Sequence, residues 1–440
     1  MITRRTLLAS TAGLPLSSLL TSCGANAASP LKVTLLEGSI PVEVLKRFRK
    51  QTDGHIAFET FTQINAIFQQ LQTLQEKAEK PGFSFRQLLP WARTEPESQP
   101  DSLVSLGDYW LTSAITQNLL DPIEISPEAL NKLPEVWQTF VSRDGTGHIQ
   151  TNAPTKTPST KNTASSEESS SSSKTSLWAA PYKIQSLVIV YRQSQFPEAT
   201  VDNPPFKTWD DLLQPKLSQK LALPNHPRIV LGLLQKIQGS SFNLSFAPNT
   251  NTDTDADTNA PDINTNSTPS PVTEQLTEQL AKQLTEPFGQ LNQQVRTYDS
   301  QNALKALINQ DVDAVVAWSG DVVGTLQRYR DLKVVVPEEG SLLSADMWVR
   351  PKGAAMGAAA QAWIDFCWQT EPATQISLSG KGLSPVFLKG ETDGESLLPP
   401  ETLSSSILPI AAMKNSEPLL PLPPEQESVY LELWQKLRSQ

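Results

Sequence analysis

The chain has 440 residues, and its 46 Asp and Glu against 36 Lys and Arg give a net charge of −10 at pH 7. This acidic balance argues against nucleic acid as a partner, since phosphate binding needs clustered Lys and Arg. The length supports two or three domains with cores of their own.

The first residues carry the features of an export signal. Arg4 and Arg5 precede an uncharged run at 7–20, which is shorter than the roughly twenty apolar residues of a membrane-spanning helix. The stretch around the two arginines resembles a twin-arginine motif, and Leu20-Thr21-Ser22-Cys23 resembles a lipobox. The resemblance implies that residues 1–22 are removed and that Cys23 is lipidated on the periplasmic side of a bacterial membrane. The alternative is an ordinary signal peptide cut elsewhere, with Cys23 lost.

The rest of the chain is then anchored rather than membrane-spanning, with residues 23–30 as a linker. With Cys23 lipidated, Cys367 has no partner for a disulfide, and its apolar surroundings predict a buried thiol in a helix.

Short apolar runs alternate with amphipathic segments from residue 31 onward. The runs predict strands at 31–37, 56–61, 102–106, 187–191, 221–223, 312–318, 332–336 and 343–349. Helical spacing predicts helices at 41–50, from 64, 108–119, 227–238, 273–291, 300–309, 321–330, 354–368 and 429–437. Nearly continuous apolar strands between amphipathic helices indicate an α/β fold of parallel sheets covered on both faces. Two such blocks predict two lobes with a cleft between them.

Three stretches have a low-complexity composition. Residues 142–176 are rich in Ser and Thr, residues 247–271 in Asn, Thr and Asp, and residues 392–428 in Pro. None offers enough apolar surface to offset the entropy of ordering. The first two are interpreted as surface insertions and the third as an extended wrapping segment.

The strand at 312–318 ends where a ligand would bind in an open α/β sheet. Trp318 closes this strand, and Ser319 and Asp321 follow it. The ring of Trp318 could stack on a ligand and attract a cation. The alternative is that Trp318 packs in the core and Asp321 caps the following helix.

A second candidate lies in the strand at 343–349. Strand alternation places Ser344 and Asp346 on one face. A carboxylate within an apolar strand is costly unless a partner or a ligand compensates its charge. Asp346 is the preferred ligand contact, and an Asp346→Asn change is expected to weaken binding and spare the fold. A salt bridge to an internal Lys or Arg is the alternative. Glu37 and Asp108, at the ends of two strands in the first half, are further candidates.

Enzyme motifs are absent from the sequence, including GxSxG, HExxH, Walker A and GxGxxG. His55, His148 and His226 have no spacing typical of a metal site or a triad. We therefore expect no catalysis, no cofactor and no metal.

Several longer segments resemble the periplasmic solute-binding proteins of ABC transporters, and within them the spermidine/putrescine-binding group. They are WAAPYKIQSLVIVY at 178–191, FKTWDDLLQPKLSQKLALPNHPRIVLGLLQKIQG at 206–239, LKALINQDVDAVVAWSGDVV at 304–323, VVVPEEGSLLSADMWVRP at 334–351 and SGKGLSPVF at 379–387. The resemblance implies a two-lobed type II fold that closes on a ligand. Residues 31–188 with 347–440 would form the first lobe, and 189–346 the second.

The resemblance assigns two residues to the ligand site. The tryptophan of the family's W-[NS]-G turn falls on Trp318, and its amine-binding aspartate falls on Asp346. Other positions depart from the family: Leu36-Glu37-Gly38-Ser39 replaces an aromatic and acidic cluster, and Asn225-His226-Pro227 replaces an acidic pair.

The resemblance implies a lipid-anchored, monomeric substrate-binding component of an ABC importer. Its partners would be a small cationic, polyamine-like solute, the permease subunits and, through Cys23, the membrane. Alternatives are the same fold with ferric iron or with an organic anion, for which Arg228 is the candidate contact, or a lipoprotein with a structural or assembly role.

Overall fold

The structure is a computed structural model that describes residues 31–52, 56–79, 101–149, 175–200, 203–243, 271–378, 382–389, 413, 415–422 and 424–439. The expected signal peptide, Cys23 and the stretch 247–270 lie outside these residues. Within the described ranges, no helix combines the length and the apolar character that crossing a membrane requires.

The first lobe is built on a parallel sheet that the amino-terminal half of the chain supplies. Strand β1 (Leu31–Leu36) pairs in parallel with β2 (Ile56–Phe61) on one side and β3 (Asp101–Gly107) on the other. The short strand β4 (Leu120–Asp121) joins this lobe through β12. The helices of this lobe are α1 (Val42–Gln51), α2 (Ile64–Glu79), α3 (Leu111–Thr116), α4 (Pro127–Leu130), α5 (Glu135–Val141), α10 (Ala358–Cys367) and α11 (Thr370–Leu378). In α1, Val44 and Phe48 are four residues apart and therefore share the buried face.

The second lobe carries helices on both faces of its sheet. Its strands are β8 (Leu221–Leu223), β9 (Val295–Tyr298), β10 (Ala314–Trp318) and β11 (Leu332–Val335), and its helices are α6 (Pro227–Ile237), α7 (Pro271–Gln294), α8 (Ala303–Ile308) and α9 (Ser319–Arg328). Along β10, Val315 belongs to one hydrophobic cluster and Val316 to the other, as strand alternation requires. Strands buried on both faces explain the continuous apolar runs of the sequence.

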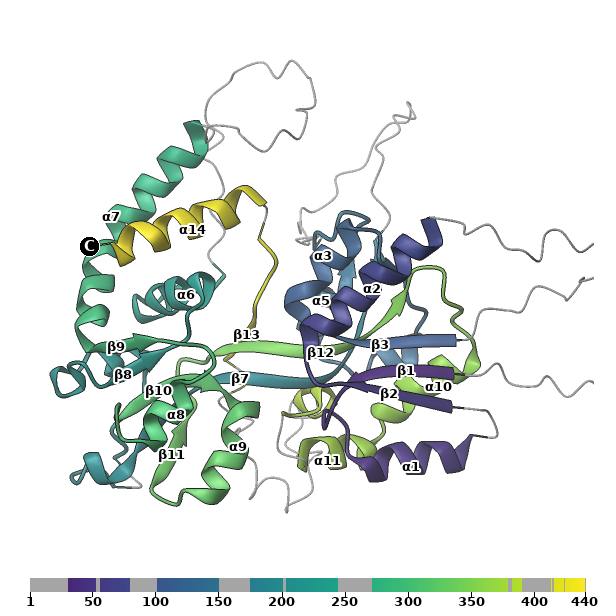
Figure 1. Cartoon of the computed structure of the whole chain (residues 1–440), viewed down its shortest axis with the longest axis horizontal. Helices are drawn as coiled ribbons and strands as arrows, with labels where there is room; N and C mark the ends of the chain where they lie inside the picture. The colour runs from purple at the N-terminus through teal and green to yellow at the C-terminus, as the bar shows by residue number, and fades with distance from the viewer. Residues whose placement is uncertain are drawn as a thin grey trace, which may run out of the picture.

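Two long strands connect the lobes (Figure 1). Strand β7 (Ala180–Arg192) pairs with β12 (Leu342–Pro351) as far as Ser186, and from Leu187 onward it pairs with β10 and β11. The resulting strand order is β2-β1-β3-β12-β7-β10-β8-β9. The expected α/β class with a large sheet flanked by helices is confirmed.

The C-terminal helix belongs to the second lobe, so the assignment of 347–440 to the first lobe is wrong for this part. Helix α14 (Pro424–Arg438) packs on α7 and α6, on the left of Figure 1. Its apolar stripe needs an apolar partner, and α7 supplies one, because both helices contribute to the same cluster. The stripe of α14 is Val429, Tyr430, Leu433, Trp434 and Leu437, and that of α7 is Leu280, Leu284, Phe288 and Leu291.

The chain reaches α14 through a further connection between the lobes. Strand β13 (Glu417–Pro418) pairs in parallel with the start of β12. Glu417 Oε1 accepts a hydrogen bond from Phe242 N at 3.0 Å, and its other oxygen accepts one from Asn243 Nδ2 at 3.0 Å. This segment, expected to be extended and wrapping, is thereby attached to the end of α6.

The Ser/Thr-rich insertion 142–176 is folded at both of its ends, which corrects the expectation for these residues. Strand β5 (Ser142–Arg143) pairs with β6 (Ser176–Leu177). Arg143 is fully buried, and its hydrogen bonds attach β5 to its surroundings. Its guanidinium donates to Thr112 Oγ1 at 2.6 Å and to Phe140 O at 3.0 Å. Residues 150–174 lie outside the described ranges.

Candidate functional site

The carboxyl ends of the parallel strands position most of the candidate residues. Glu37 follows β1 and is exposed, whereas Asp108 follows β3 and is buried in a 3-10 turn at Asp108–Trp110. In the second lobe, Trp318 ends β10 and is half-buried, Ser319 begins α9 and is buried, and Asp321 is exposed in the first turn of α9. In open sheets, ligands bind beyond these ends.

The register of β7 relates the candidates of the two lobes to one another. Asp346 is paired with Lys183, Ser344 with Gln185, and Trp318 with Leu187. Positions 183, 185 and 187 share one face of β7, so their partners lie on that face as well. Asp346 and Trp318 flank β7 on opposite sides and are offset by four residues, about 13 Å along the strand. They can therefore contact opposite ends of one elongated ligand, but they cannot both contact the same ligand atom.

Asp346 forms an ion pair inside the protein. Its Oδ2 lies 2.7 Å from Nζ of Lys183, and the side chains are 15% and 2% exposed. The alternative of a salt bridge to an internal lysine is thus the arrangement in the structure, and a ligand contact at Asp346 stays a prediction. Lys183 was missed as a site residue. The sequence contained a signal for it, because Lys183 is the one charged residue in the run APYKIQSLVIVY. A charge is as unusual in that run as Asp346 is in its own strand.

Asp108 and Ser344 form a second contact between β3 and β12. Ser344 Oγ donates to Asp108 Oδ1 at 2.8 Å, and Asp108 Oδ2 is buried without a hydrogen-bond partner among the described residues. Burial raises the pKa of Asp108 to about 6, although hydrogen bonds from Ser344 and from the backbone of Ala345 and Tyr109 act in the opposite direction. The negative charge of Asp346 adds to the rise in pKa. The carboxyl group therefore ionises near neutral pH.

Asp108 is expected to make stability depend on pH. Its folded pKa of about 6 lies above the ordinary value of 3.8, so the folded state keeps a proton that the unfolded chain releases. The stability contributed by this group is complete below about pH 4 and is lost as pH rises through 6, by roughly 3 kcal/mol. Asp108→Asn removes the titration and leaves an acceptor for Ser344.

Urea unfolding of Asp108→Asn and of the unmodified protein, measured from about pH 4 to 7.5, tests this expectation. The free energy of unfolding of the variant, relative to the unmodified protein, should rise across this range. A difference that does not change with pH would contradict it. The comparison cancels the other acidic groups, which titrate in both proteins.

An aromatic contact joins the lobes next to these residues. The ring of Tyr109, 54% exposed, lies 5.7 Å from the ring of His226 at an interplanar angle of 83°. Tyr109 follows Asp108 in the first lobe, and His226 precedes α6 in the second. Neither was a candidate, although an aromatic directly after a strand-end carboxylate was a usable signal. On the second lobe, Ser319 Oγ accepts a hydrogen bond from Ser186 N at 3.2 Å and links α9 to β7.

Arg228, the candidate contact for an anion, is engaged by the C-terminal segment. Its Nη2 donates to Leu420 O at 3.0 Å and to Asn243 Oδ1 at 3.2 Å, and its guanidinium lies 5.4 Å from the ring centroid of Tyr430. These contacts engage Nη2, whereas Nε of Arg228 is buried without a hydrogen-bond partner among the described residues.

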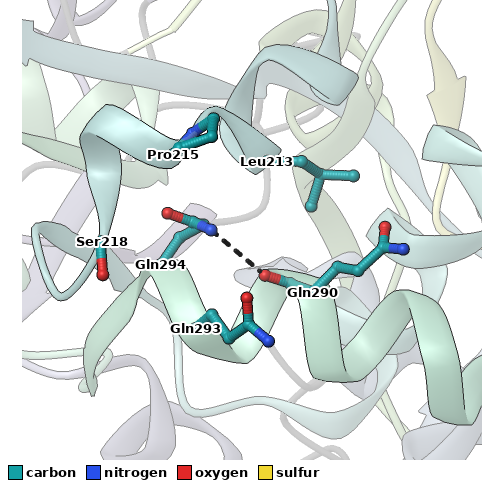
Figure 2. Close-up of a pocket in the computed structure, with 6 residues that line it drawn as sticks. All are labelled: Leu213, Pro215, Ser218, Gln290, Gln293 and Gln294. Carbon is teal, nitrogen blue, oxygen red and sulfur yellow. Dashed lines mark hydrogen bonds between the residues drawn. The ribbon is translucent and has the colours of Figure 1, made fainter.

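A hollow of about 330 Å³ lies elsewhere in the second lobe (Figure 2). Its lining is Leu213, Pro215, Ser218, Gln290, Gln293 and Gln294. Ser218 and Gln294 come just before β8 and β9, so the hollow adjoins the amino ends of these strands, opposite the edge where ligands bind. Across the described ranges, no group of three His, Cys, Asp or Glu is arranged to hold a metal ion.

Comparisons with solved structures agree with this architecture. The spermidine/putrescine ABC transporter substrate-binding protein PotD from Streptococcus pneumoniae has a TM-score of 0.63 at 19% identity, with 94% of this chain and 99% of that chain covered. A putative spermidine/putrescine ABC transporter from Listeria monocytogenes has a TM-score of 0.53 at 19% identity, over 93% and 99%. The maltodextrin binding protein MalE1 from L. casei has a TM-score of 0.54 at 13% identity, over 94% and 93%.

These neighbours share the fold while their names point to different solutes, so the fold alone does not identify a ligand. A search of curated proteins found no match. A family model described as bacterial extracellular solute-binding protein matches residues 99–403, well over half of the chain. The expectation of solute binding rather than catalysis is thereby confirmed. This match agrees with the two lobes and with the polar residues at the strand ends. The chain belongs to the family of bacterial extracellular solute-binding proteins.

Proposed function

We propose that the chain is the substrate-binding component of an ABC importer and takes a small cationic, polyamine-like solute between its lobes. The family and the two lobes joined by β7 and β12 support capture by hinge closure. In this proposal the protein is exported, held at the membrane by lipidated Cys23, and passes its solute to permease subunits as a monomer.

The observation that carries the cationic class is the buried carboxyl group of Asp108. Its Oδ2 has no hydrogen-bond partner among the described residues, and an ionised carboxylate without a partner is costly to bury. An ammonium group supplies the missing donor, and its positive charge adds to that of Arg143, whose buried guanidinium already interacts with Asp108. Glu37 and Asp321 add negative charge beyond the carboxyl ends of β1 and β10, and the ring of Trp318 offers a face that attracts cations.

The spacing of the candidates supports an elongated solute. Trp318 and Ser344, which binds Asp108, lie on strands on opposite sides of β7, so a ligand that contacts both must reach across that strand. An organic anion receives less support, because Nη2 of Arg228 already donates to Leu420 O and to Asn243 Oδ1.

A thermal-shift panel on the chain without residues 1–23 tests the proposal, with isothermal titration calorimetry for each compound that raises the melting temperature. The panel contains monoamines, putrescine, spermidine, amino acids, ferric iron, small anions and maltodextrin. We expect amines to stabilise the protein, with an affinity that falls as salt rises and increases as pH rises through about 6, where Asp108 ionises. Stabilisation by an anion or a sugar alone would refute the cationic class.

Asp108→Asn is expected to weaken amine binding about tenfold, since a hydrogen bond between charged groups contributes about 1.5–3 kcal/mol. Asp311→Asn is the matched control. It makes the same change in net charge at an exposed residue before the amino end of β10, and should leave the affinity within about twofold. Equal losses in both variants would mean that Asp108 acts only through the overall charge.

A further inference from the structure

Lys183 is a lysine in a position where lysine is rarely tolerated. It lies within β7 with 2% of its side chain exposed, and its Nζ donates to Asp346 Oδ2 at 2.7 Å. Lysine is almost never fully buried unless it is paired, so the ion pair with Asp346 accounts for its presence. The converse also holds, because Lys183 compensates the carboxylate that made Asp346 a candidate ligand contact.

The backbone beside Lys183 is shaped to admit its side chain. Gly382 has a φ of +153°, and a Cβ there would lie 2.6 Å from Cγ of Lys183 and 2.6 Å from the carbonyl oxygen of Ile184. Two backbone hydrogen bonds between Ile184 and Leu383, of 2.7 and 2.8 Å, hold this segment against β7. The lysine stem is thus packed in place, and its ammonium is fixed at the carboxylate.

The pair changes the charge that a solute meets at Asp346. The carboxylate and the ammonium sum to zero, so Asp346 attracts a second positive charge far less than an uncompensated carboxylate would. A few residues away, Asp108 keeps a buried oxygen without a partner among the described residues. The two groups are neighbours, because Asp346 pairs with Gly107 and Ser344 bonds to Asp108. At this end of the site, Asp108 therefore favours a positive charge, and the pair beside it favours an uncharged polar group.

We propose that Lys183 is a specificity-determining residue, a resident ammonium that selects solutes with a single positive charge over diamines and longer polyamines. The solute places its ammonium at Asp108 and a neutral, hydrogen-bonding end at the pair of Lys183 and Asp346. This inference rests on the proposed binding of a small cationic solute. It narrows that class to solutes with one positive charge, in place of the polyamine-like solutes.

Two probes of similar length that differ by one charge test the inference: 4-amino-1-butanol and putrescine. Isothermal titration calorimetry on the chain without residues 1–23 gives the ratio of their dissociation constants. We expect the unmodified protein to bind 4-amino-1-butanol about tenfold more tightly than putrescine. In Lys183→Met, which keeps the length of the side chain and removes its charge, the ratio should move at least tenfold toward putrescine.

The matched control is Lys352→Met. Lys352 Nζ lies 2.8 Å from Asp121 Oδ1 in an exposed pair just beyond the far end of β12, so the variant makes the same change in net charge away from the site. Its ratio should stay within about twofold of the unmodified protein. A shift equal to that of Lys183→Met would assign the effect to overall charge and overturn the proposal.

The double variant Lys183→Met with Asp346→Asn tests whether the neutral charge of the pair, rather than another property of the two side chains, sets the ratio. It contains no uncompensated charge, and like the original pair it is neutral. Its ratio should remain within about threefold of the unmodified protein. A tenfold shift in either direction would overturn the inference.

The failure of the inference differs from the failure of the proposed function. The inference fails if the unmodified protein binds putrescine at least as tightly as 4-amino-1-butanol, or if Lys183→Met leaves the ratio unchanged. The proposed function fails if no amine binds while an anion or a sugar does.

Discussion

Asp346→Asn is expected to lower the free energy of unfolding by about 3–5 kcal/mol, because it leaves the ammonium of Lys183 buried without a counter-charge. The sequence alone predicted that this change would spare the fold. With Lys183 only 2% exposed, that prediction no longer holds. Urea unfolding at pH 7 gives the measurement, and a loss of binding in this variant must be separated from a loss of folded protein.

Two variants serve as controls for this result. Asp121→Asn removes the carboxylate of a partly exposed pair, in which Lys352 is 41% and Asp121 20% exposed, and should cost no more than about 1 kcal/mol. Adding Lys183→Met to Asp346→Asn should restore most of the lost stability, because no unpaired charge remains. If Asp346→Asn alone costs less than about 1 kcal/mol, the buried ammonium of Lys183 does not need the carboxylate of Asp346 as its counter-charge.

Leu433→Ala should destabilise the second lobe by about 2–5 kcal/mol. Leu433 is fully buried where α14 packs on α7 and α6, and its truncation leaves a cavity in addition to the lost burial. Urea unfolding followed by tryptophan fluorescence measures the effect, since Trp434 and Trp209 belong to the same cluster.

Leu431→Ala is the matched comparison on the same helix. Leu431 is 49% exposed, so the same change of side chain should cost less than about 0.5 kcal/mol. Equal effects at the two positions would mean that helix propensity, rather than packing on α7, governs the stability of α14.

The regular elements were predictable where local pattern decides the structure. The run at 56–61 forms β2 with the same bounds, and the helix predicted at 227–238 is α6, which begins at Pro227 as expected. The strand predicted at 187–191 is much longer in the structure, because β7 begins at Ala180. Pro181 and Lys183 argue against a central strand in a sequence. In the structure Asp346 of β12 pairs with Lys183, and an irregularity in the register lies between the partners of Lys183 and Pro181.

The partners of the candidate residues were not predictable in the same way. The ion pair of Lys183 and Asp346 depends on the register between β7 and β12, which tertiary packing decides, so the sequence left ligand and salt bridge as alternatives. The contact of Tyr109 with His226 depends on how the two lobes meet. For the C-terminal helix the apolar stripe was predictable from the sequence, but the stripe alone does not identify the surface on which it packs.

The position of α14 also governs the order in which the lobes can fold. The sheet of the second lobe is complete once β11 ends at Val335, yet its core stays uncovered until residues 424–438 have been synthesised and have packed on α7. The intervening residues include β12, α10 and α11, most of which belong to the first lobe. We therefore expect apolar residues of α7 such as Leu284 and Phe288 to stay exposed until α14 has packed on them, a state in which chaperones bind.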